Sequence, residues 1–375
     1  MNFQTVIIKP HGSFCNLNCE YCFYLGKKNL YDGPPSQHKM PEAVMKKLIR
    51  NVFDVSALPV FVWHGGEPTL MGLDFFKEVV RFQHRCAHGK SYANAIQTNG
   101  LLLNDQWAEF FKDEKFLVGI SFDGPEHVHD RYRIDKNGSG TFDKVFEKAK
   151  LLLEKGVQVN VLATVNAYSV KFSEEIYHFF SDNGFNFMQF SPVVESNPDS
   201  GQAMPFSVTA NEYGRFLNEL FHLWVNDFDF KHLRQKTSIR FFDSLIQLYS
   251  GMIPDHCIFQ KACGNYLVVE HNGDIFSCDY LVSPETLLGN LNETSLDQAF
   301  CSPKHIAFQN QKAELGPECN KCKWLKFCYG GCIKDRIRDP EDKGRNRFCR
   351  SYQYFFIRAD KKLQKFASLY RQYYQ

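Results

Sequence analysis

Eleven of the thirteen cysteines in this chain of 375 residues occur in groups whose spacing is typical of iron–sulfur ligands. The first group is Cys15, Cys19 and Cys22, in the run CNLNCEYC. Three thiolates on one loop can bind three irons of a [4Fe–4S] cluster and leave the fourth iron open, and an open coordination position is where a metal site performs chemistry. Zinc is the alternative, and His11 or His38 would then supply its fourth ligand.

The other eight cysteines lie far along the chain and are enough for two clusters with four protein ligands each. They are Cys257, Cys263, Cys278, Cys319, Cys322, Cys328, Cys332 and Cys349. Spacing alone places Cys319 and Cys332 in one group, and it does not establish how the eight cysteines meet in space. Such clusters can carry electrons, or they can simply stabilise a segment with little regular core. Cys86 and Cys301 match no group and are interpreted as incidental thiols.

Composition narrows the class of protein. The 44 basic and 42 acidic residues nearly balance, which gives no sign of nucleic-acid binding or of a polybasic membrane anchor. The first residues do not have the pattern of a secretion signal, and no apolar run has the length of a membrane span. We therefore expect a cytoplasmic protein, in which clustered cysteines are more often metal ligands than disulfides.

Apolar runs of strand length alternate with amphipathic runs of helix length in the first half of the chain. Strands are expected at residues 6–9, 59–64, 94–97, 116–120, 157–165 and 185–190. Helices are expected at residues 40–53, 73–88, 106–112, 142–155, 169–183 and 209–228. This alternation predicts a parallel α/β sheet, either doubly wound or closed fully or partly into a barrel. From Cys257 to Cys349 regular periodicity fades, and a closing amphipathic helix is expected at residues 351–374.

The unusual segments come directly after predicted strands, where parallel α/β folds place their sites. These segments are the cysteine loop, Gly65-Gly66-Glu67-Pro68, Gln97-Thr98-Asn99-Gly100 and Ser121-Phe122-Asp123-Gly124-Pro125. Glycines let the backbone approach a ligand closely, and the N–H groups of Gly65 and Gly66 can then point into the site. Each segment taken alone could be an ordinary turn. The loop at residues 191–207 is expected to link the barrel to the C-terminal half of the chain or to cover the mouth of the barrel.

The run CNLNCEYCFY after a first strand resembles the signature of the radical S-adenosylmethionine (SAM) enzymes. In that superfamily the open iron binds SAM, and one electron from the cluster cleaves SAM to a 5′-deoxyadenosyl radical. The resemblance implies a partial (β/α)6 parallel barrel. It also implies cofactor-binding roles for Tyr21, Tyr24, His64, Gly65, Gly66, Glu67, Gln97, Ser121, Asp123 and Arg133. Core packing is the alternative for the two tyrosines, and a solvated surface position is the alternative for Arg133.

The C-terminal cysteines resemble the SPASM domain, an extension of radical SAM enzymes that modify peptides and proteins. The resemblance implies one auxiliary [4Fe–4S] cluster on Cys257, Cys263, Cys278 and Cys332. It implies another on Cys319, Cys322, Cys328 and Cys349, and therefore three clusters in all. The expected domains are a radical SAM partial barrel over residues 1–235, a SPASM domain over 236–350 and a C-terminal helix over 351–375 that packs on the barrel.

A resemblance to anaerobic sulfatase-maturating enzymes covers essentially the whole chain, including WHGGEPTL, FLVGISFDGP, HDRYR and ECNKCKWLKFCYGGC. It implies oxidation of a cysteine or serine in a C/S-x-P-x-R motif of an unfolded or nascent sulfatase to Cα-formylglycine. Asp279, directly after Cys278, would be the catalytic base; the alternative is that it caps a turn. The residue before GGEP varies between Gln and His in this family, and here it is His64. An electron donor such as flavodoxin or ferredoxin is implied, and neither nucleic acid nor membrane is.

Two other functions are compatible with the same cysteines. A radical SAM enzyme of this type could instead form thioether cross-links in a peptide. Many such enzymes carry an N-terminal peptide-binding domain, for which we expect no room here because the first strand begins within ten residues. A non-catalytic electron carrier is the third possibility, and the polar segments after four strands disfavour it.

Overall fold

The computed structural model describes residues 3–197, 199–229, 234–337 and 345–374. The chain divides into two compact units, each assembled from separate stretches of sequence. Unit 1 comprises Met1–Ser121, Tyr132–Val159 and Gly264–Gln309. Unit 2 comprises Phe122–Arg131, Asn160–Cys263 and Asn310–Gln375. These units are defined by contacts rather than by sequence modules, so the domain boundaries at residues 235 and 350 stay a prediction.

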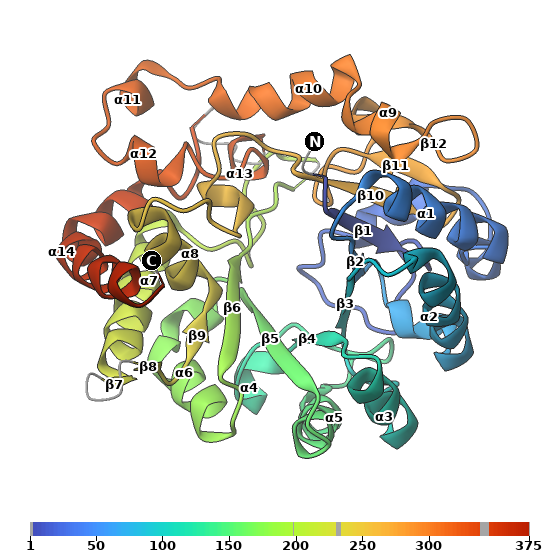
Figure 1. Cartoon of the computed structure of the whole chain (residues 1–375). Coiled ribbons are helices and arrows are strands. Elements are labelled where there is room, and N and C mark those ends of the chain that lie inside the picture. Colours follow the sequence, from blue (N-terminus) through green and yellow to red (C-terminus); the bar gives the residue numbers. More distant parts are fainter. Residues whose placement is uncertain (1–2, 198, 230–233, 338–344, 375) are drawn as a thin grey trace. The chain divides into compact units, whose positions relative to one another are not determined.

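Unit 1 is built on a parallel sheet whose strands follow one another in sequence (Figure 1). The strands are β1 (Thr5–Lys9), β2 (Val60–Trp63), β3 (Ala93–Thr98) and β4 (Leu117–Ser121), each paired in parallel with the next. The connecting helices are α1 (Glu42–Val55), α2 (Leu73–Ala87) and α3 (Asp105–Asp113), and α5 (Phe142–Glu154) follows β4. The predicted alternation of strands and helices is confirmed here, with ends within three residues of those expected.

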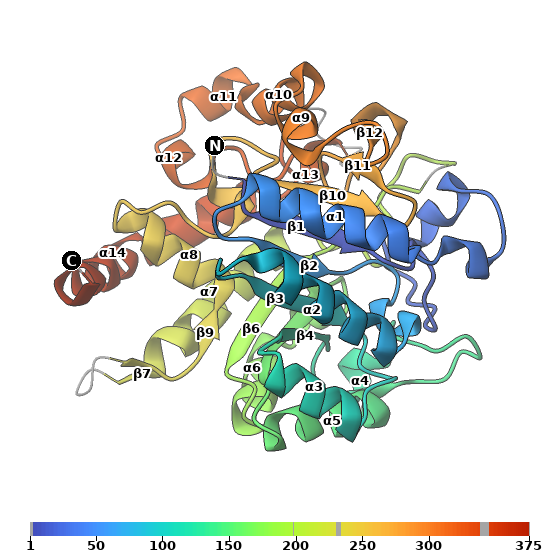
Figure 2. The ribbon, with the colours of Figure 1, turned by 45° about the vertical axis from the view of Figure 1, so that its right-hand side comes forward.

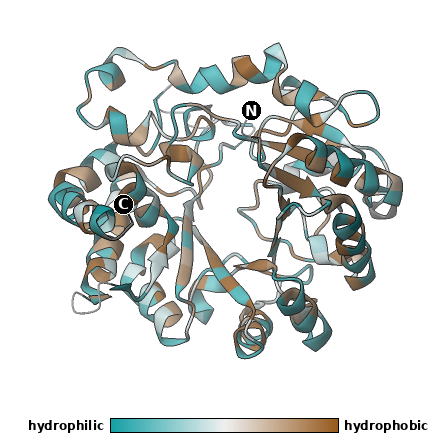
Figure 3. Ribbon diagram, viewed as in Figure 1, coloured by the Kyte–Doolittle hydropathy of each residue, from teal (hydrophilic) through white to brown (hydrophobic). Residues whose placement is uncertain are grey.

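The helices α1, α2 and α3 cover one side of this sheet (Figures 1 and 2). In α1 the buried positions Met45, Leu48, Ile49 and Val52 recur every three or four residues, which gives the helix one apolar face. That face packs inward while the exposed side stays polar, so the helices carry both colours of the hydropathy scale and the strands are mainly brown (Figure 3).

Three short strands in the cysteine-rich region extend the sheet of unit 1, although the sequence predicted no regular structure there. β10 (Tyr266–Glu270) pairs in parallel with β1, and β11 (Asp274–Phe276) and β12 (Leu287–Asn290) continue the sheet in antiparallel order. The strands are too short to show a clear alternation, and β10 is buried along almost its whole length. The expectation of irregular structure was therefore wrong for this segment. The helices α9 (Leu296–Phe300) and α10 (Pro303–Asn310) follow.

Unit 2 contains the rest of the parallel strands and a helical layer. β5 (Gln158–Val165), which begins in unit 1, pairs with β6 (Phe187–Pro192), and β6 pairs with β9 (Ser238–Ile239). The larger helices are α6 (Ser173–Asp182), α7 (Ala210–Asn226), α8 (Arg240–Tyr249) and α14 (Cys349–Tyr374). The smaller elements are α4 (Glu126–His129), β7 (Phe228–Asp229), β8 (Arg234–Gln235), α11 (Pro317–Asn320), α12 (Leu325–Cys328) and α13 (Lys334–Ile337).

The C-terminal helix α14 packs on α7 and α8 through aromatic side chains. Phe355 contacts Phe221 and Phe242, with ring centroids 5.3 and 5.8 Å apart, and Phe366 contacts Trp224 at 5.4 Å. Aromatic side chains bury large apolar areas, so these contacts fix the helix against its own unit. Across the described residues, no helix combines the length and the apolar character needed to cross a membrane.

Candidate functional site

The cysteine loop, residues 10–24, follows β1 directly and brings three thiols together. The pKa of the Cys15 thiol is raised to about 12, mainly by burial and in addition by the nearby Glu67, Cys19 and Cys22, because like charges repel. The loop is tied to the segment after β4 by the Asn18 N–H, which donates to the Ile134 carbonyl at 2.9 Å. The three predicted ligands therefore face one small region within unit 1.

The two histidines considered as zinc ligands contact other residues. His38 Nε2 is 3.1 Å from the Asp32 carbonyl, and its ring stacks on His271 at 4.9 Å. His11 packs edge-on against Phe14, 5.9 Å away. Among the residues that the structure describes, no three or more His, Cys, Asp and Glu side chains are arranged to hold a single metal ion.

Asn99, just past the end of β3, contacts the first thiol of the cysteine loop. Its Nδ2 donates to Cys15 Sγ at 3.5 Å and to Asn16 Oδ1 at 2.8 Å. Its Oδ1 accepts the Leu101 N–H at 3.0 Å, which fixes the orientation of the amide. The asparagine is therefore held so that its NH₂ group faces the thiol.

The Gly65-Gly66 backbone supports the cysteine loop. The Gly66 N–H donates to the Gly12 carbonyl and the Glu67 N–H to the Phe14 carbonyl, both at 2.8 Å. A Cβ atom on Gly66 would lie 1.9 Å from the Phe14 oxygen, so only glycine fits. The Gly65 N–H donates to His64 Nδ1 at 2.7 Å. Both glycine N–H groups are therefore engaged within the protein.

Glu67 is 1% exposed, and both of its carboxylate oxygens accept hydrogen bonds. Oε1 accepts from the Thr69 N–H, the Thr69 hydroxyl and the Thr98 hydroxyl, at 3.0, 2.6 and 2.7 Å. Oε2 accepts the Asn99 N–H at 2.7 Å. Burial raises the pKa of Glu67 and these hydrogen bonds oppose the rise. The carboxylate ties the end of β2 to the end of β3, and so holds Asn99 beside the cysteine loop.

The remaining predicted cofactor contacts of unit 1 lie at the ends of β3 and β4 and in the segment after β4. Gln97 Nε2 donates to the Ser121 hydroxyl at 3.0 Å. The Arg133 guanidinium is buried and lies 5.5 Å from the centre of the Tyr21 ring, which also packs edge-on against Tyr132. This part of unit 1 therefore combines hydroxyl and amide groups with a buried cation.

Asp123 belongs to unit 2, where it has a structural contact. Its Oδ1 accepts the Thr164 N–H at 2.8 Å, and its own N–H donates to His129 Nδ1 at 3.3 Å. Asp123 is 1% exposed, and its carboxylate binds the backbone near the C-terminal end of β5, within its own unit.

Asp279 forms a buried ion pair with Lys9, the last residue of β1. Lys9 is completely buried and Asp279 is 8% exposed. Burial alone would raise the pKa of the Asp279 carboxyl, but the Lys9 ammonium outweighs it and holds the pKa below its ordinary value. Asp279 is therefore ionised at neutral pH, which is the state that a base requires.

His64 contacts the Lys9 ammonium of this ion pair. Its Nδ1 lies 3.0 Å from Lys9 Nζ and 2.7 Å from the Gly65 nitrogen. Both of those groups only donate, so Nδ1 must accept and the proton of the neutral ring lies on Nε2. Burial and the Lys9 charge lower the pKa of His64 to about 4, so the ring is neutral at pH 7.

Tyr24 lies beneath the Lys9 ammonium and links it to a second carboxylate. Lys9 Nζ is 4.6 Å from the centre of the Tyr24 ring, and the Tyr24 hydroxyl donates to Glu270. The ring is 2% exposed and packs with Val268 and Phe276. Tyr24 thus has a polar edge at the site and an apolar body in the core.

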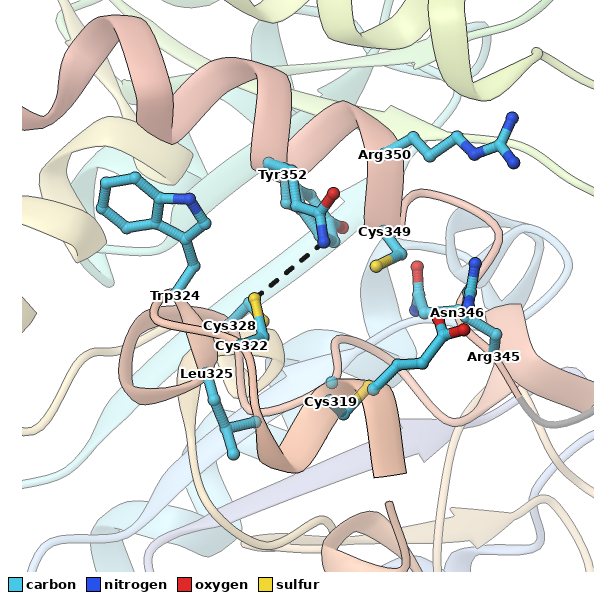
Figure 4. Close-up of a pocket in the computed structure, with 13 residues that line it drawn as sticks. Cys319, Cys322, Trp324, Leu325, Cys328, Arg345, Asn346, Cys349, Arg350 and Tyr352 are labelled. Atoms are coloured by element: carbon cyan, nitrogen blue, oxygen red, sulfur yellow. Dashed lines mark hydrogen bonds and ion pairs between the residues drawn. The ribbon is translucent and has the colours of Figure 1, made fainter. Parts of the chain in front are cut away.

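Four cysteines of unit 2 line one pocket (Figure 4). Cys319 lies in α11, Cys322 in the following turn, Cys328 at the end of α12 and Cys349 at the start of α14. The pKa of Cys349 is raised to about 11, mainly by burial and in addition by the nearby Cys319, Cys328 and Cys322. The four thiols thus come together from two segments of the chain.

Cys332, in contrast, lies near Cys257 and Cys263. The buried Lys312 donates to the Cys257 carbonyl at 2.7 Å, and the charges of Cys263, Cys257 and Cys332 oppose the lowering of its pKa by burial. Cys278 belongs to unit 1, with its Sγ 3.6 Å from the Tyr266 hydroxyl. The assignment of Cys332 to one cluster with Cys257, Cys263 and Cys278 stays a prediction.

Three residues of this site did not enter the predicted set: Lys9, Asn99 and Glu270. Lys9 could have been noticed as a charged residue that ends an apolar strand just before the cysteine loop. Asn99 was part of a segment already singled out by its position. Glu270 gave no signal, because it lies in a strand that the sequence did not predict.

Comparisons with known proteins agree with these arrangements. Residues 9–178 match the model of the radical SAM superfamily, and residues 257–323 match the SPASM iron–sulfur cluster-binding domain. The fold class predicted from the sequence is thereby confirmed.

Curated relatives match over nearly the full chain. A serine-type anaerobic sulfatase-maturating enzyme of Bacteroides thetaiotaomicron is 37% identical over 94% of this chain and 88% of its own length. A cysteine-type enzyme of Clostridium novyi is 34% identical over 100% of both chains. The solved structure of native anSMEcpe with bound AdoMet and Cp18Cys peptide is 32% identical, with a TM-score of 0.87 over 97% of this chain and 99% of that one. The chain therefore belongs to the anaerobic sulfatase-maturating enzymes, a family of radical SAM enzymes with a SPASM domain.

Proposed function

We propose that this enzyme oxidises a cysteine or serine in a C/S-x-P-x-R motif of a sulfatase to Cα-formylglycine. Family membership supports the sulfatase as substrate. The observation that carries the chemical assignment is Asp279, a buried and ionised carboxylate held by Lys9 in the same unit as the cysteine loop.

The residues present fit the cofactors of such a reaction. The converging thiols of Cys15, Cys19 and Cys22 would bind a [4Fe–4S] cluster, and the two other cysteine groups would bind one auxiliary cluster each. SAM would lie against the cysteine loop, with Gln97, Ser121 and Arg133 near its polar groups. When bound, the clusters and SAM supply single electrons and a 5′-deoxyadenosyl radical that takes a hydrogen atom from the substrate Cβ.

Asp279 would remove the proton from the substrate thiol or hydroxyl. Formation of the aldehyde from serine removes one hydrogen atom from Cβ, one proton from the hydroxyl and one electron. Cysteine loses the same three particles to give a thioaldehyde, and water then replaces sulfur by oxygen. The proton needs an acceptor inside the site, and an ionised carboxylate provides one.

Lys9 and His64 would keep this base in place. A buried carboxylate without a partner is costly, and the Lys9 ammonium compensates its charge while His64 fixes the ammonium from the other side. The His64 Nε2–H remains as a hydrogen-bond donor for the substrate. Tyr24 excludes water from beneath the pair.

The variant Asp279→Asn tests the role of Asp279 as base and leaves the residues proposed to bind SAM unchanged. We expect the variant to bind SAM as the wild type does, while peptide oxidation falls by at least about a hundredfold, a typical contribution of a general base. The assay is anaerobic incubation with SAM, dithionite and a C-x-P-x-R or S-x-P-x-R peptide, with 5′-deoxyadenosine and peptide product measured in parallel. Asp297→Asn, on an exposed position of α9 in the same unit, is the matched control. Unchanged turnover of Asp279→Asn would remove its role as base.

A further inference from the structure

The segments that supply Cys319, Cys322, Cys328 and Cys349 to the pocket also carry basic side chains. Arg345 and Arg350 line the pocket, and the exposed Lys321, Lys323 and Lys326 lie between Cys319 and Cys328 in the sequence. We call these five residues the basic rim. Residues 317–328 and 345–350 contain six basic residues and one acidic residue, whereas the whole chain has a net charge of +2. Positive charge is therefore concentrated around this pocket.

The only acidic residue of these two segments does not neutralise the lysines. Glu318 forms an ion pair with Arg345 at the wall of the pocket. Among the residues that the structure describes, Lys321, Lys323 and Lys326 form no ion pair with a carboxylate.

Two of these lysines, Lys323 and Lys326, lie over aromatic rings, which limits the movement of their side chains. Lys323 Nζ lies 4.6 Å from the centre of the Trp324 ring and Lys326 Nζ 4.9 Å from that of Phe327. Trp324 stacks on Phe356 of α14 at 5.5 Å, and Phe327 stacks on Tyr249 of α8 at 4.0 Å. Charges held on packed rings lose less conformational freedom when they bind a partner.

The partial exposure of the four cysteines in the pocket indicates which kind of partner would bind. These cysteines are partly exposed, so a cluster bound by them would lie close to the surface. Electron carriers form small, transient interfaces, and complementary charge raises their rate of association. A positive rim around a redox group therefore fits an acidic carrier protein.

We infer that the basic rim is the docking site of a small acidic one-electron carrier protein. This inference rests on the proposed function, in which oxidation of the substrate releases one electron per turnover beyond the hydrogen atom. The carrier, docked in its oxidised form at the basic rim, takes up that electron and leaves reduced by one electron.

Charge reversal tests this docking site directly. The rim variant is Lys321→Glu/Lys323→Glu/Lys326→Glu. The control variant, Lys361→Glu/Lys362→Glu/Lys365→Glu, makes the same change of charge on exposed positions of α14, about 18 Å or more along the helix from Cys349. The dissociation constant of each reconstituted holoenzyme for oxidised flavodoxin is measured by calorimetry between about 50 and 300 mM salt. Iron content and circular dichroism verify that both variants are folded and loaded.

We expect the wild type and the control to bind flavodoxin with an affinity that falls as salt rises, and the rim variant to bind at least about tenfold more weakly. Equal affinity of the rim variant and the wild type would overturn the docking site. So would equal weakening of both variants, binding that salt does not change, or binding of single-stranded RNA in place of flavodoxin.

Dithionite separates the two proposals, because a small reductant needs no docking site. With dithionite, peptide oxidation by the rim variant should match that of the wild type, and a parallel loss would overturn the docking role. If no protein oxidised the peptide but charge reversal still weakened flavodoxin binding, the proposed function would fail and the docking site would stand.

Discussion

Gly66→Ala is the change for which the structure predicts the largest local effect. The new Cβ would lie 1.9 Å from the Phe14 oxygen, 2.4 Å from the Phe14 carbonyl carbon and 2.6 Å from the Ser13 carbonyl carbon. All three are backbone atoms, so no side chain can rotate away. The cysteine loop must instead separate from the Gly66-Glu67 backbone.

The cost follows from the two hydrogen bonds that join these segments. Separation breaks the bond from Gly66 N–H to the Gly12 carbonyl and the bond from Glu67 N–H to the Phe14 carbonyl, each 2.8 Å long. A buried polar group without a partner costs about 1–3 kcal/mol, so the local free energy of opening should fall by about 2–6 kcal/mol. That corresponds to exchange of the loop amides at least about 30-fold faster than in the wild type.

Hydrogen exchange with mass spectrometry, applied anaerobically to the apo chain, measures this change in residues 10–24. Iron content after reconstitution shows whether the loop still binds its cluster. Gly26→Ala is the matched control, because no atom lies within 4 Å of its added Cβ. Loop exchange in Gly66→Ala within a factor of about three of the wild type, with normal iron content, would refute the reasoning.

Three further changes test the charges and contacts of the site. Lys9→Met leaves the Asp279 carboxylate buried without its partner, so we expect a loss of about 3–5 kcal/mol of unfolding free energy, largely recovered in Lys9→Met/Asp279→Asn; denaturant titration measures both. Because the pKa of His64 is lowered from 6.5 to about 4, only the unfolded chain binds its proton between these values, and stability falls as the pH falls through them. His64→Gln should remove at most about 3 kcal/mol of that loss, as unfolding of the apo chain at pH 6.5 and 4.5 would show. Asn99→Leu removes an N–H donor from Cys15 and should make the potential of the cluster on this loop more negative in a redox titration followed by electron paramagnetic resonance; an unchanged potential would contradict the contact.

The parts of the fold that the sequence predicts well are those with long, regular periodicity. Helix α1 was expected at residues 40–53 and runs from Glu42 to Val55, because its buried positions repeat over four turns. Strand β10 was missed, because four consecutive buried residues between turns carry no alternation and its pairing with β1 joins residues about 260 positions apart.

The features of the candidate site were likewise predicted only in part. The spacing of the cysteines predicted the group on the loop, but it placed Cys332 with Cys319. The set that lines the pocket of unit 2, with Cys349, was implied only by the resemblance to SPASM domains. The sequence did not predict that Gly66 and Glu67 serve the protein's own backbone, because a short turn motif has the same sequence whether its N–H groups face a ligand or another loop. Nor did it predict the pair of Lys9 and Asp279, which lie 270 positions apart in the sequence and meet only through the fold.

The central claim is that the chain converts a sulfatase motif to an aldehyde. The most direct measurement is mass spectrometry of C-x-P-x-R and S-x-P-x-R peptides after anaerobic incubation of the reconstituted wild type with SAM and dithionite, with and without hydrazine. We predict that the serine peptide loses two hydrogen atoms, or that the cysteine peptide exchanges its SH group for an aldehyde oxygen, and that the product reacts with hydrazine. Peptides that stay unchanged, or that lose hydrogen without becoming reactive to hydrazine, would contradict the claim.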